Sequence, residues 1–154
     1  GLGGAVFPMA AILARSDLDR VPELALGHYT HEKSPVGCAA ALATLDTIER
    51  EDLMTRARTL GATALARMKD MEQRYGIVRE ARGLGLHLGI ELANASGPAT
   101  DAAERVLYHS LENGLSYKLG AGCVITLCPP LTISDTEMTR ALDIVEQGIA
   151  AVDG

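Results

Sequence analysis

Aromatic residues and clustered basic residues are both scarce in this sequence, and their scarcity excludes one class of partner. Aromatic side chains make up 3% of the 154 residues, too few for the stacking platforms that bind single-stranded nucleic acid. The net charge is −6, and 14 lysines and arginines are scattered among 20 acidic residues. A nucleic-acid surface would show a basic stripe, so we expect no nucleic-acid partner.

Cysteine is also sparse, and long apolar runs are missing. The three cysteines, Cys38, Cys123 and Cys128, lack Cys-x-x-Cys spacing, which favours reduced, buried thiols over disulfides or a zinc site. No apolar run reaches the ~18 residues that span a bilayer, and no basic segment precedes an apolar one as in a signal peptide. These patterns predict a cytoplasmic protein without a membrane partner.

The first fifty residues do not have the pattern of a complete domain. Residues 1–14, GLGGAVFPMAAILA, combine a glycine cluster with a short apolar run, typical of a buried strand entered through a glycine turn. The G-x-G-x-x-G spacing of a dinucleotide site is absent. After a polar loop, Ser34 and Pro35 predict the start of a helix that is apolar nearly all round and packs on more than one side. We interpret residues 1–50 as the end of a larger domain.

Residues 51–154 begin with a helix and a strand. Apolar side chains spaced by three and four predict a helix over residues 53–75, and Gly76 is its natural stop. Over residues 84–92 the leucines and isoleucine alternate with glycine and polar residues. Alternation of this kind is typical of a half-buried strand in an antiparallel or mixed sheet.

The remainder completes a small α+β domain. A second helix ends at Gly114, and residues 115–118 and 123–128 read as two short strands about a glycine turn. Ser134 and Glu137 have capping-box spacing and predict the start of a last helix. The order helix, strand, helix, strand pair, helix is that of a compact α+β domain.

Four segments together resemble the class III aminotransferases. The stretch after that family's catalytic lysine is similar to residues 1–14, and its phosphate-binding loop with the following helix is similar to residues 27–49, GHYTHEKSPVGCAAALATLDTIE. A small-domain strand written Val-Arg-Gly-x-Gly-Leu-x-x-Gly resembles residues 78–92, and a Pro-Pro-Leu-Thr segment resembles residues 128–134, CPPLTIS. The four run in family order at family spacing. The Thr-His-x-x-x-Pro form of the loop is most similar to 2,2-dialkylglycine decarboxylase-like members.

The resemblance implies an α/β fold, that of the fold-type I transferases dependent on pyridoxal 5'-phosphate (PLP). Residues 1–50 would end the large PLP-binding domain, and residues 51–154 would form the small C-terminal α+β domain. PLP is the implied cofactor, and its lysine is expected immediately before Gly1, so no catalytic residue is expected in the chain itself. Thr30 matches the threonine that binds the PLP phosphate of the other subunit, which implies a homodimer or a dimer of such dimers.

The histidines beside Thr30 do not predict a metal site. His28 and His31 stand three apart on an irregular loop without further cysteine or histidine nearby, which argues against zinc. In the decarboxylase this loop helps to hold an alkali cation with backbone oxygens and an aspartate. Ser34 occupies the position of that aspartate, which argues against the same site here, and we expect no metal ligands.

The main departure from the family lies at Thr126. Class III enzymes that act on α-amino acids usually carry an arginine three residues before Pro-Pro, and it binds the substrate carboxylate as a bidentate fork. Threonine cannot form that ion pair. Either the substrate lacks a carboxylate at this locus or another cation binds it, and Lys118 is the nearest candidate. Arg82 is expected to have a structural role.

The implied activity is that of a PLP-dependent aminotransferase, which moves an amino group between an amine or amino acid and a keto acid. The same fold also supports decarboxylation, elimination and racemisation, for example an ammonia-lyase acting on an amino-phosphonate or amino-phosphate. A non-catalytic binding module is a further alternative. The residue before Gly1 distinguishes them, since a lysine there supports an enzyme.

Overall fold

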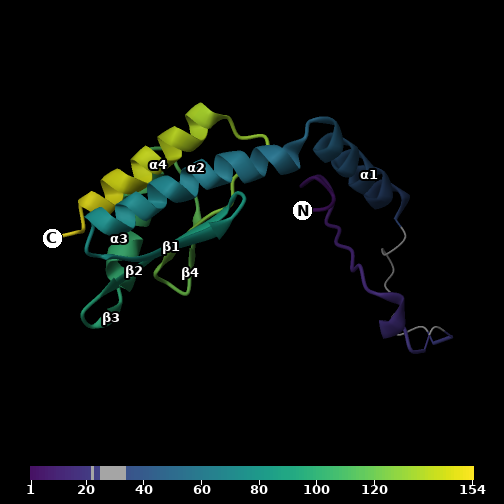
Figure 1. The fold of residues 1–154 in the computed structure, drawn as a ribbon, viewed down its shortest axis with the longest axis horizontal. Coiled ribbons are helices and arrows are strands. Elements are labelled where there is room, and N and C mark those ends of the chain that lie inside the picture. The colour runs from purple at the N-terminus through teal and green to yellow at the C-terminus, as the bar shows by residue number, and fades with distance from the viewer. Residues whose placement is uncertain (22, 25–33) are drawn as a thin grey trace. The chain divides into compact units, whose positions relative to one another are not determined.

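The computed structural model describes residues 1–21, 23–24 and 34–154 of the chain. They divide into two compact units, Gly1–Leu53 and Met54–Gly154, and most of their helices and strands are labelled in Figure 1. Within the described residues no helix is both long enough and apolar enough to span a bilayer.

The first unit contains a short 3-10 helix, η1 (Ser16–Leu18), and one long helix, α1 (Pro35–Arg50). The predicted start of α1 is confirmed, because the Ser34 hydroxyl accepts a hydrogen bond from the Gly37 amide at 3.4 Å and proline opens the helix. The prediction that α1 packs on several sides is wrong within this unit. Its buried residues are Gly37 and Ala41, whereas Leu42 is 62% exposed.

Residues 1–14 do not form the predicted strand. Residues 1–7 make turns and residues 8–14 have no regular structure, with Ile12 and Leu13 95% and 99% exposed. A strand needs a neighbouring backbone to accept and donate its hydrogen bonds, and the described residues of this unit contain no strand. The apolar run alone was therefore not enough to predict a strand, because the described residues of this unit contain no strand with which it could pair.

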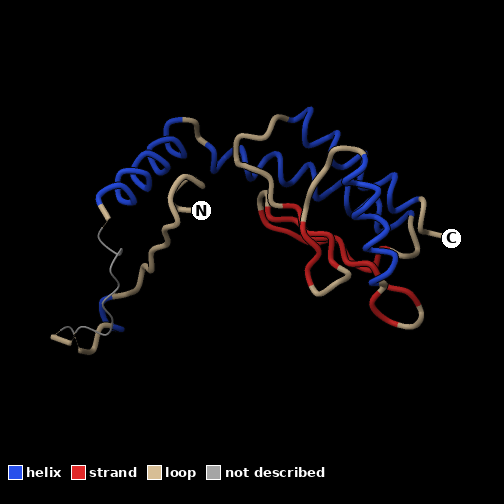
Figure 2. The backbone as a smooth tube through the Cα atoms, turned by 180° about the vertical axis from the view of Figure 1, so that it is seen from behind, coloured by secondary structure: helices blue, strands red, loops and turns tan. Residues whose placement is uncertain are grey.

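In the second unit three helices cover one face of an antiparallel sheet, as Figure 2 shows. The strand order is β1-β2-β5-β4, and the short β3 pairs with β2. The helices are α2 (Leu53–Arg74), α3 (Thr100–Glu112) and α4 (Asp135–Ala150). The strands are β1 (Val78–Leu84), β2 (His87–Asn94), β3 (Gly97–Pro98), β4 (Lys118–Gly120) and β5 (Val124–Leu127).

One hydrophobic core lies between the three helices and the inner face of the sheet. Alternate side chains of β2 and β5 enter it, and the buried positions of the helices recur every three or four residues, as one face of each helix requires. Side chains with at most 1% exposure in this core are Ala64, Met68, Met71, Ala81, Leu88, Ile90, Leu92, Ala103, Val106, Ile125, Val145 and Ile149. The opposite face of the sheet, called the outer face below, is left without a helix in this unit.

The strand predicted over residues 84–92 is the end of one strand, a turn and a second strand. Gly85 has a φ of +55°, so the chain reverses there and β1 pairs antiparallel with β2. Leu84 is consequently 89% exposed, while Leu86 is 5% exposed within the turn. The turn residue Leu86 is itself buried, so the alternation of apolar with other residues continues through the turn. The sequence pattern therefore did not reveal that the chain reverses at Gly85.

The other predicted ends agree with the structure more closely. Asn113 caps α3 and Gly114 has a φ of +86°. The capping box of α4 is confirmed: the Ser134 hydroxyl accepts from the Glu137 amide at 3.1 Å, and the Glu137 carboxylate accepts from the Ser134 amide at 2.8 Å. The strand expected from residue 115 begins instead at Lys118.

The three cysteines are unpaired, and they differ in burial. Cys123 is buried, but Cys38 and Cys128 are exposed. The expectation of three buried thiols is therefore correct for Cys123 alone, because Cys38 lies on the sparsely packed α1 and Cys128 lies just beyond the end of β5.

Candidate substrate-binding site

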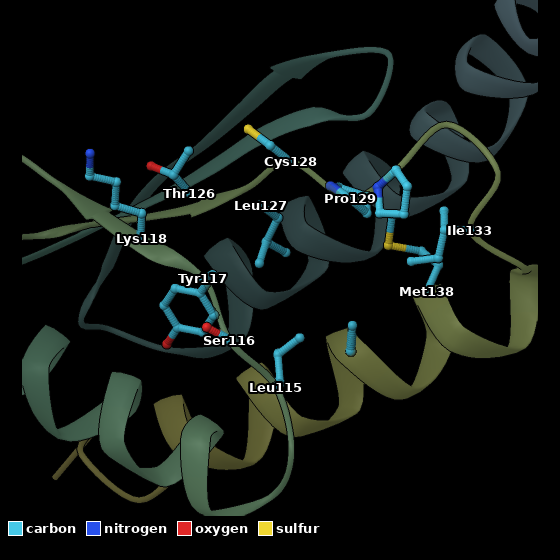
Figure 3. Close-up of a pocket in the computed structure, with 12 residues that line it drawn as sticks. Leu115, Ser116, Tyr117, Lys118, Thr126, Leu127, Cys128, Pro129, Ile133 and Met138 are labelled. Atoms are coloured by element: carbon cyan, nitrogen blue, oxygen red, sulfur yellow. The ribbon is translucent and has the colours of Figure 1, made fainter. Parts of the chain in front are cut away.

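A row of four residues crosses the outer face of the sheet. Lys118 of β4 pairs with Thr126 of β5, Thr126 pairs with Gly89 of β2, and Gly89 pairs with Arg82 of β1. Side chains alternate along a strand, and Thr126 therefore points away from the core that its neighbour Leu127 enters. In Figure 3, Lys118 and Thr126 lie side by side and point away from Leu127. The two residues singled out from the sequence are thus direct cross-strand neighbours.

Thr126 lies beside the Lys118 side chain on β4, whereas its neighbour on β2 is a glycine without a side chain. Its hydroxyl bonds weakly to the Val124 carbonyl oxygen at 3.4 Å. On β2 the facing residue is Gly89, where an added Cβ would meet nothing nearer than Val124 Cγ1 at 3.4 Å. Thr126 therefore has no side chain beside it on β2, and Lys118 lies on its opposite side.

Arg82, the other charged residue of the row, belongs to a group of charged side chains on β1 and β2 that pair with one another. The Arg82 guanidinium lies 2.6 Å from Glu80 and 3.0 Å from Glu91, and Arg79 lies 3.3 Å from Glu91. The hydrogen bond with Glu91 is the main reason that the pKa of Arg82 is raised above its ordinary value. Two positive and two negative charges cancel here, and Arg82 is held by two carboxylates. No carboxylate of the described residues forms an ion pair with Lys118.

Lys118 and Thr126 also line a cavity of about 580 Å³ (Figure 3). Most of its wall is apolar, with hydroxyls from Ser116 and Tyr117. Burial, partly offset by a hydrogen bond with Ser110, raises the pKa of Tyr117 above its ordinary value of 10.0, so the phenol stays neutral. The apolar lining side chains are Leu115, Leu127, Pro129, Pro130, Ile133, Met138 and Ala141.

Cys128, which also lines this cavity, has its thiol in contact with an imidazole. Cys128 Sγ lies 3.1 Å from His87 Nδ1, because Leu88 and Leu127 are paired in register and bring the next residues of both strands together. Sequence analysis assigned no role to this pair. The signal that could have found it is the register between β2 and β5, which depends on recognising the turn at Gly85.

The residue expected to bind the PLP phosphate is Thr30. Thr30, with its neighbours His28 and His31, lies outside the described residues. The described residues that follow fit an anionic group, because α1 begins at Pro35 and the N-terminal end of a helix carries partial positive charge. Among residues 1–21, 23–24 and 34–154 no cluster of three or more metal-ligating side chains is found.

Known proteins match the chain along nearly its whole length. A sequence model described as Aminotransferase class-III matches residues 1–149. The (R)-1-hydroxy-2-aminoethylphosphonate ammonia-lyase of Vibrio splendidus is 43% identical over 99% of the chain, a match that covers 32% of that protein. The chain spans about a third of the length of the curated relatives that it matches.

Solved structures of two kinds of enzyme share the fold. The acetylornithine aminotransferase of Elizabethkingia anophelis superposes with a TM-score of 0.85 and 28% identity, covering 97% of this chain and 37% of that one. A phospholyase from Arthrobacter, in complex with phosphoethanolamine, has a TM-score of 0.72 and 30% identity, covering 76% of this chain and 29% of that one.

Proposed function

The chain belongs to the class III aminotransferase family, and from this we propose that it is the C-terminal part of a PLP-dependent enzyme that acts on a small primary amine. The expected family, the fold of the fold-type I PLP transferases and the PLP cofactor of that family are confirmed. Because the chain spans about a third of its relatives, the activity proposed is that of a longer protein. We assign residues 1–50 to the end of its large domain and residues 51–154 to its small domain.

Amino-group transfer from an amine to a keto acid is the proposed reaction. The observation that carries it is the match of residues 1–149 to the class III aminotransferases. The amine is proposed to lack a carboxylate on the reacting carbon, because Thr126 offers a hydroxyl where a guanidinium fork would bind one. Arg82, in the same row, is already bonded to Glu80 and Glu91.

Elimination of ammonia from an amino-phosphonate or amino-phosphate is a second candidate. Two observations favour it: the 43% identity with an ammonia-lyase whose named substrate is an aminoethylphosphonate, and the likeness to a phospholyase bound to phosphoethanolamine. Both compounds carry an amine and a phosphorus oxyanion and lack a carboxylate. They therefore agree with the absence of an arginine at Thr126.

In either reaction the residues of this chain would bind and orient the cofactor and the substrate. PLP, when bound, withdraws the electrons released as a bond to the amine-bearing carbon breaks. Thr30 is proposed to donate a hydrogen bond to the phosphate of the PLP in the partner subunit, which makes the functional unit a homodimer. The catalytic lysine is proposed immediately before Gly1. The reduced cysteines and the family resemblance favour a cytoplasmic location.

One assay of the full-length protein separates the two reactions. The PLP-loaded protein is incubated with 1-hydroxy-2-aminoethylphosphonate and with phosphoethanolamine, which carry a hydroxyl or phosphate leaving group next to the amine-bearing carbon, and with simple amines, each with and without pyruvate. Transfer forms alanine only when pyruvate is present, whereas elimination releases ammonia without it. Borohydride reduction followed by peptide mapping should place the pyridoxyl group on the residue before Gly1. Absence of both products with every amine would contradict both reactions.

A further inference from the structure

Cys128 and His87 form a pair of reactive side chains for which the proposed function has no use. Cys128 Sγ lies 3.1 Å from His87 Nδ1, and both residues are exposed. Leu88 of β2 and Leu127 of β5 are register partners, and each is the sequence neighbour of one member of the pair. Figure 3 shows the Cys128 side chain pointing away from that of Leu127, which enters the core. The thiol and the imidazole are therefore brought together by paired backbone.

An imidazole beside a thiol supplies a base for it. The thiolate is the nucleophilic form of cysteine, and a free thiol is only a few per cent ionised at pH 7. When its Nδ1 atom is unprotonated, His87 can accept the proton of Cys128 and leave a thiolate beside an imidazolium. Cys38 is exposed as well, but in the part of the chain that the structure describes only Cys128 has its thiol bonded to an imidazole. Cys38 is therefore an exposed thiol for comparison within the same molecule.

Cys128 and His87 also share a cavity with a positive charge. Both line a cavity of about 510 Å³ formed by the first turns of α2, the turn between β1 and β2 and the segment after β5, a volume within the range of small-molecule sites. Most of its lining is apolar, and Arg58 is the one charged residue among the described residues that form it. No carboxylate of the described residues forms an ion pair with Arg58. The cavity therefore attracts a small anion more strongly than a small cation.

We propose that Cys128 is a thiol–disulfide exchange site for small anionic disulfides, with His87 as the base and Arg58 as the charge that attracts them. His87 takes the thiol proton, and the Cys128 sulfur attacks one sulfur of the disulfide, so that a new S–S bond forms and the old one breaks. The departing thiolate takes the proton from the His87 imidazolium. Each exchange oxidises the Cys128 sulfur and reduces the departing sulfur to a thiol, so no further oxidant is needed. This modification goes beyond the PLP reaction and is independent of it.

Timed labelling of the full-length, PLP-loaded protein tests the role of His87. The protein is exposed at pH 7 to dithiodipropionate, a dianionic disulfide, quenched with acid, and the adducts at Cys128 and Cys38 are followed by peptide mass. Cys128 should react about 3- to 30-fold faster in the wild type than in His87→Gln, since full ionisation of a thiol that is a few per cent ionised gains about 30-fold at most. Cys38 should react equally in both proteins, and equal PLP absorbance shows that the variant folds. A Cys128 that does not react, or whose rate is unchanged in His87→Gln, would overturn the proposal.

Disulfides of opposite charge test the role of Arg58. The ratio of the Cys128 labelling rate with dithiodipropionate to that with cystamine, a dicationic disulfide, should fall about 2- to 10-fold in Arg58→Gln, the range for an exposed charge pair. The matched control is Arg105→Gln, which removes an exposed arginine of α3 that does not line the cavity and should leave the ratio unchanged. Equal ratios in the wild type and Arg58→Gln would overturn the assignment of anionic disulfides.

Discussion

Gly61 of α2 lies so close to Gly85 that a Cβ on Gly61 would stand 2.1 Å from the Gly85 carbonyl oxygen. Gly85 forms the turn between β1 and β2 with a φ of +55°, a conformation that favours glycine. The helix and the turn therefore approach each other closely because neither carries a side chain at the contact.

Gly61→Ala is expected to destabilise the protein, although alanine is normally the better helix former by about 0.5–1 kcal/mol. The added methyl group meets backbone atoms, which cannot rotate away, and overpacking of this kind costs about 1–3 kcal/mol. The midpoint of thermal unfolding of the full-length protein, at a fixed PLP concentration, should fall. Gly76→Ala is the control, since its Cβ would meet only Asp153 at 3.7 Å. Equal midpoints for the two variants would refute the contact.

Glu146 of α4 binds two arginines of α2, and this predicts a pH dependence. Arg74 lies 2.6 Å and Arg67 2.7 Å from its two carboxylate oxygens. Burial raises the pKa of Glu146, but the hydrogen bonds from Arg67 and Arg74 outweigh it and hold the pKa below its ordinary value of 4.5. A lowered folded-state pKa contributes stability above the unfolded-state pKa, and that stability is lost as the pH falls through the folded-state value.

Glu146→Gln should therefore lower the free energy of unfolding at pH 7 by about 1–3 kcal/mol, the range for bonds to charged groups that are partly exposed. The difference from the wild type should shrink once the pH drops below about 4.5. Asp70→Asn is the control, because it removes an exposed partner of Arg74 on the same helix and should cost at most about 0.5 kcal/mol. A difference that stays constant from pH 7 to pH 3 would show that Glu146 acts through packing alone.

The helix ends were predictable because their signals are local. Ser134 and Glu137 stand three residues apart in the sequence and bond to each other across the same three residues in the structure. The strand predicted from Leu84 was wrong at its start, because a turn with a buried residue continues the alternation of a strand. The strand predicted within residues 1–14 was wrong because a strand depends on pairing with a neighbouring strand, which the local sequence does not contain.

In the site, too, single residues could be found from the local sequence, whereas their contacts depend on how distant strands pair. Thr126 was singled out by its distance from Pro129 and Pro130, and Lys118 by its sign of charge. That these two side chains are direct neighbours follows from the register of β4 and β5, and the contact between His87 and Cys128 follows from the register of β2 and β5. Register depends on turn geometry and on burial of one face, so composition and spacing could nominate the residues but could not pair them.

Thr30→Ala is expected to weaken PLP binding. The resemblance assigns its hydroxyl to the PLP phosphate of the partner subunit, and losing a hydrogen bond to a charged group costs about 1–3 kcal/mol. Apo-protein is titrated with PLP and followed by cofactor absorbance. Thr30→Ser keeps the hydroxyl and should bind nearly as well as the wild type. An unchanged PLP affinity in Thr30→Ala would show that Thr30 does not have the role that the family motif assigns to it.

Thr126→Arg should change the choice of substrate. The wild type lacks a guanidinium at this position and is expected to prefer common α-amino acids only weakly over amines of the same size. An arginine there can bind a carboxylate through two parallel hydrogen bonds, and truncating one partner of such a buried pair costs about 2–5 kcal/mol, so its introduction is worth up to that amount.

The measurement is the ratio of kcat/KM for alanine to that for ethylamine in the full-length protein. Thr126→Arg should raise this ratio by about 30-fold, which corresponds to about 2 kcal/mol, the lower end of that range, since each 1.4 kcal/mol is a factor of ten. Thr126→Met is the matched control, because it adds bulk without charge and should leave the ratio near that of the wild type. A positive charge already stands opposite, at Lys118, and it could serve a carboxylate in place of the arginine. If the wild type favours alanine a hundredfold and Lys118→Ala preserves that preference, neither the missing arginine nor Lys118 governs substrate choice.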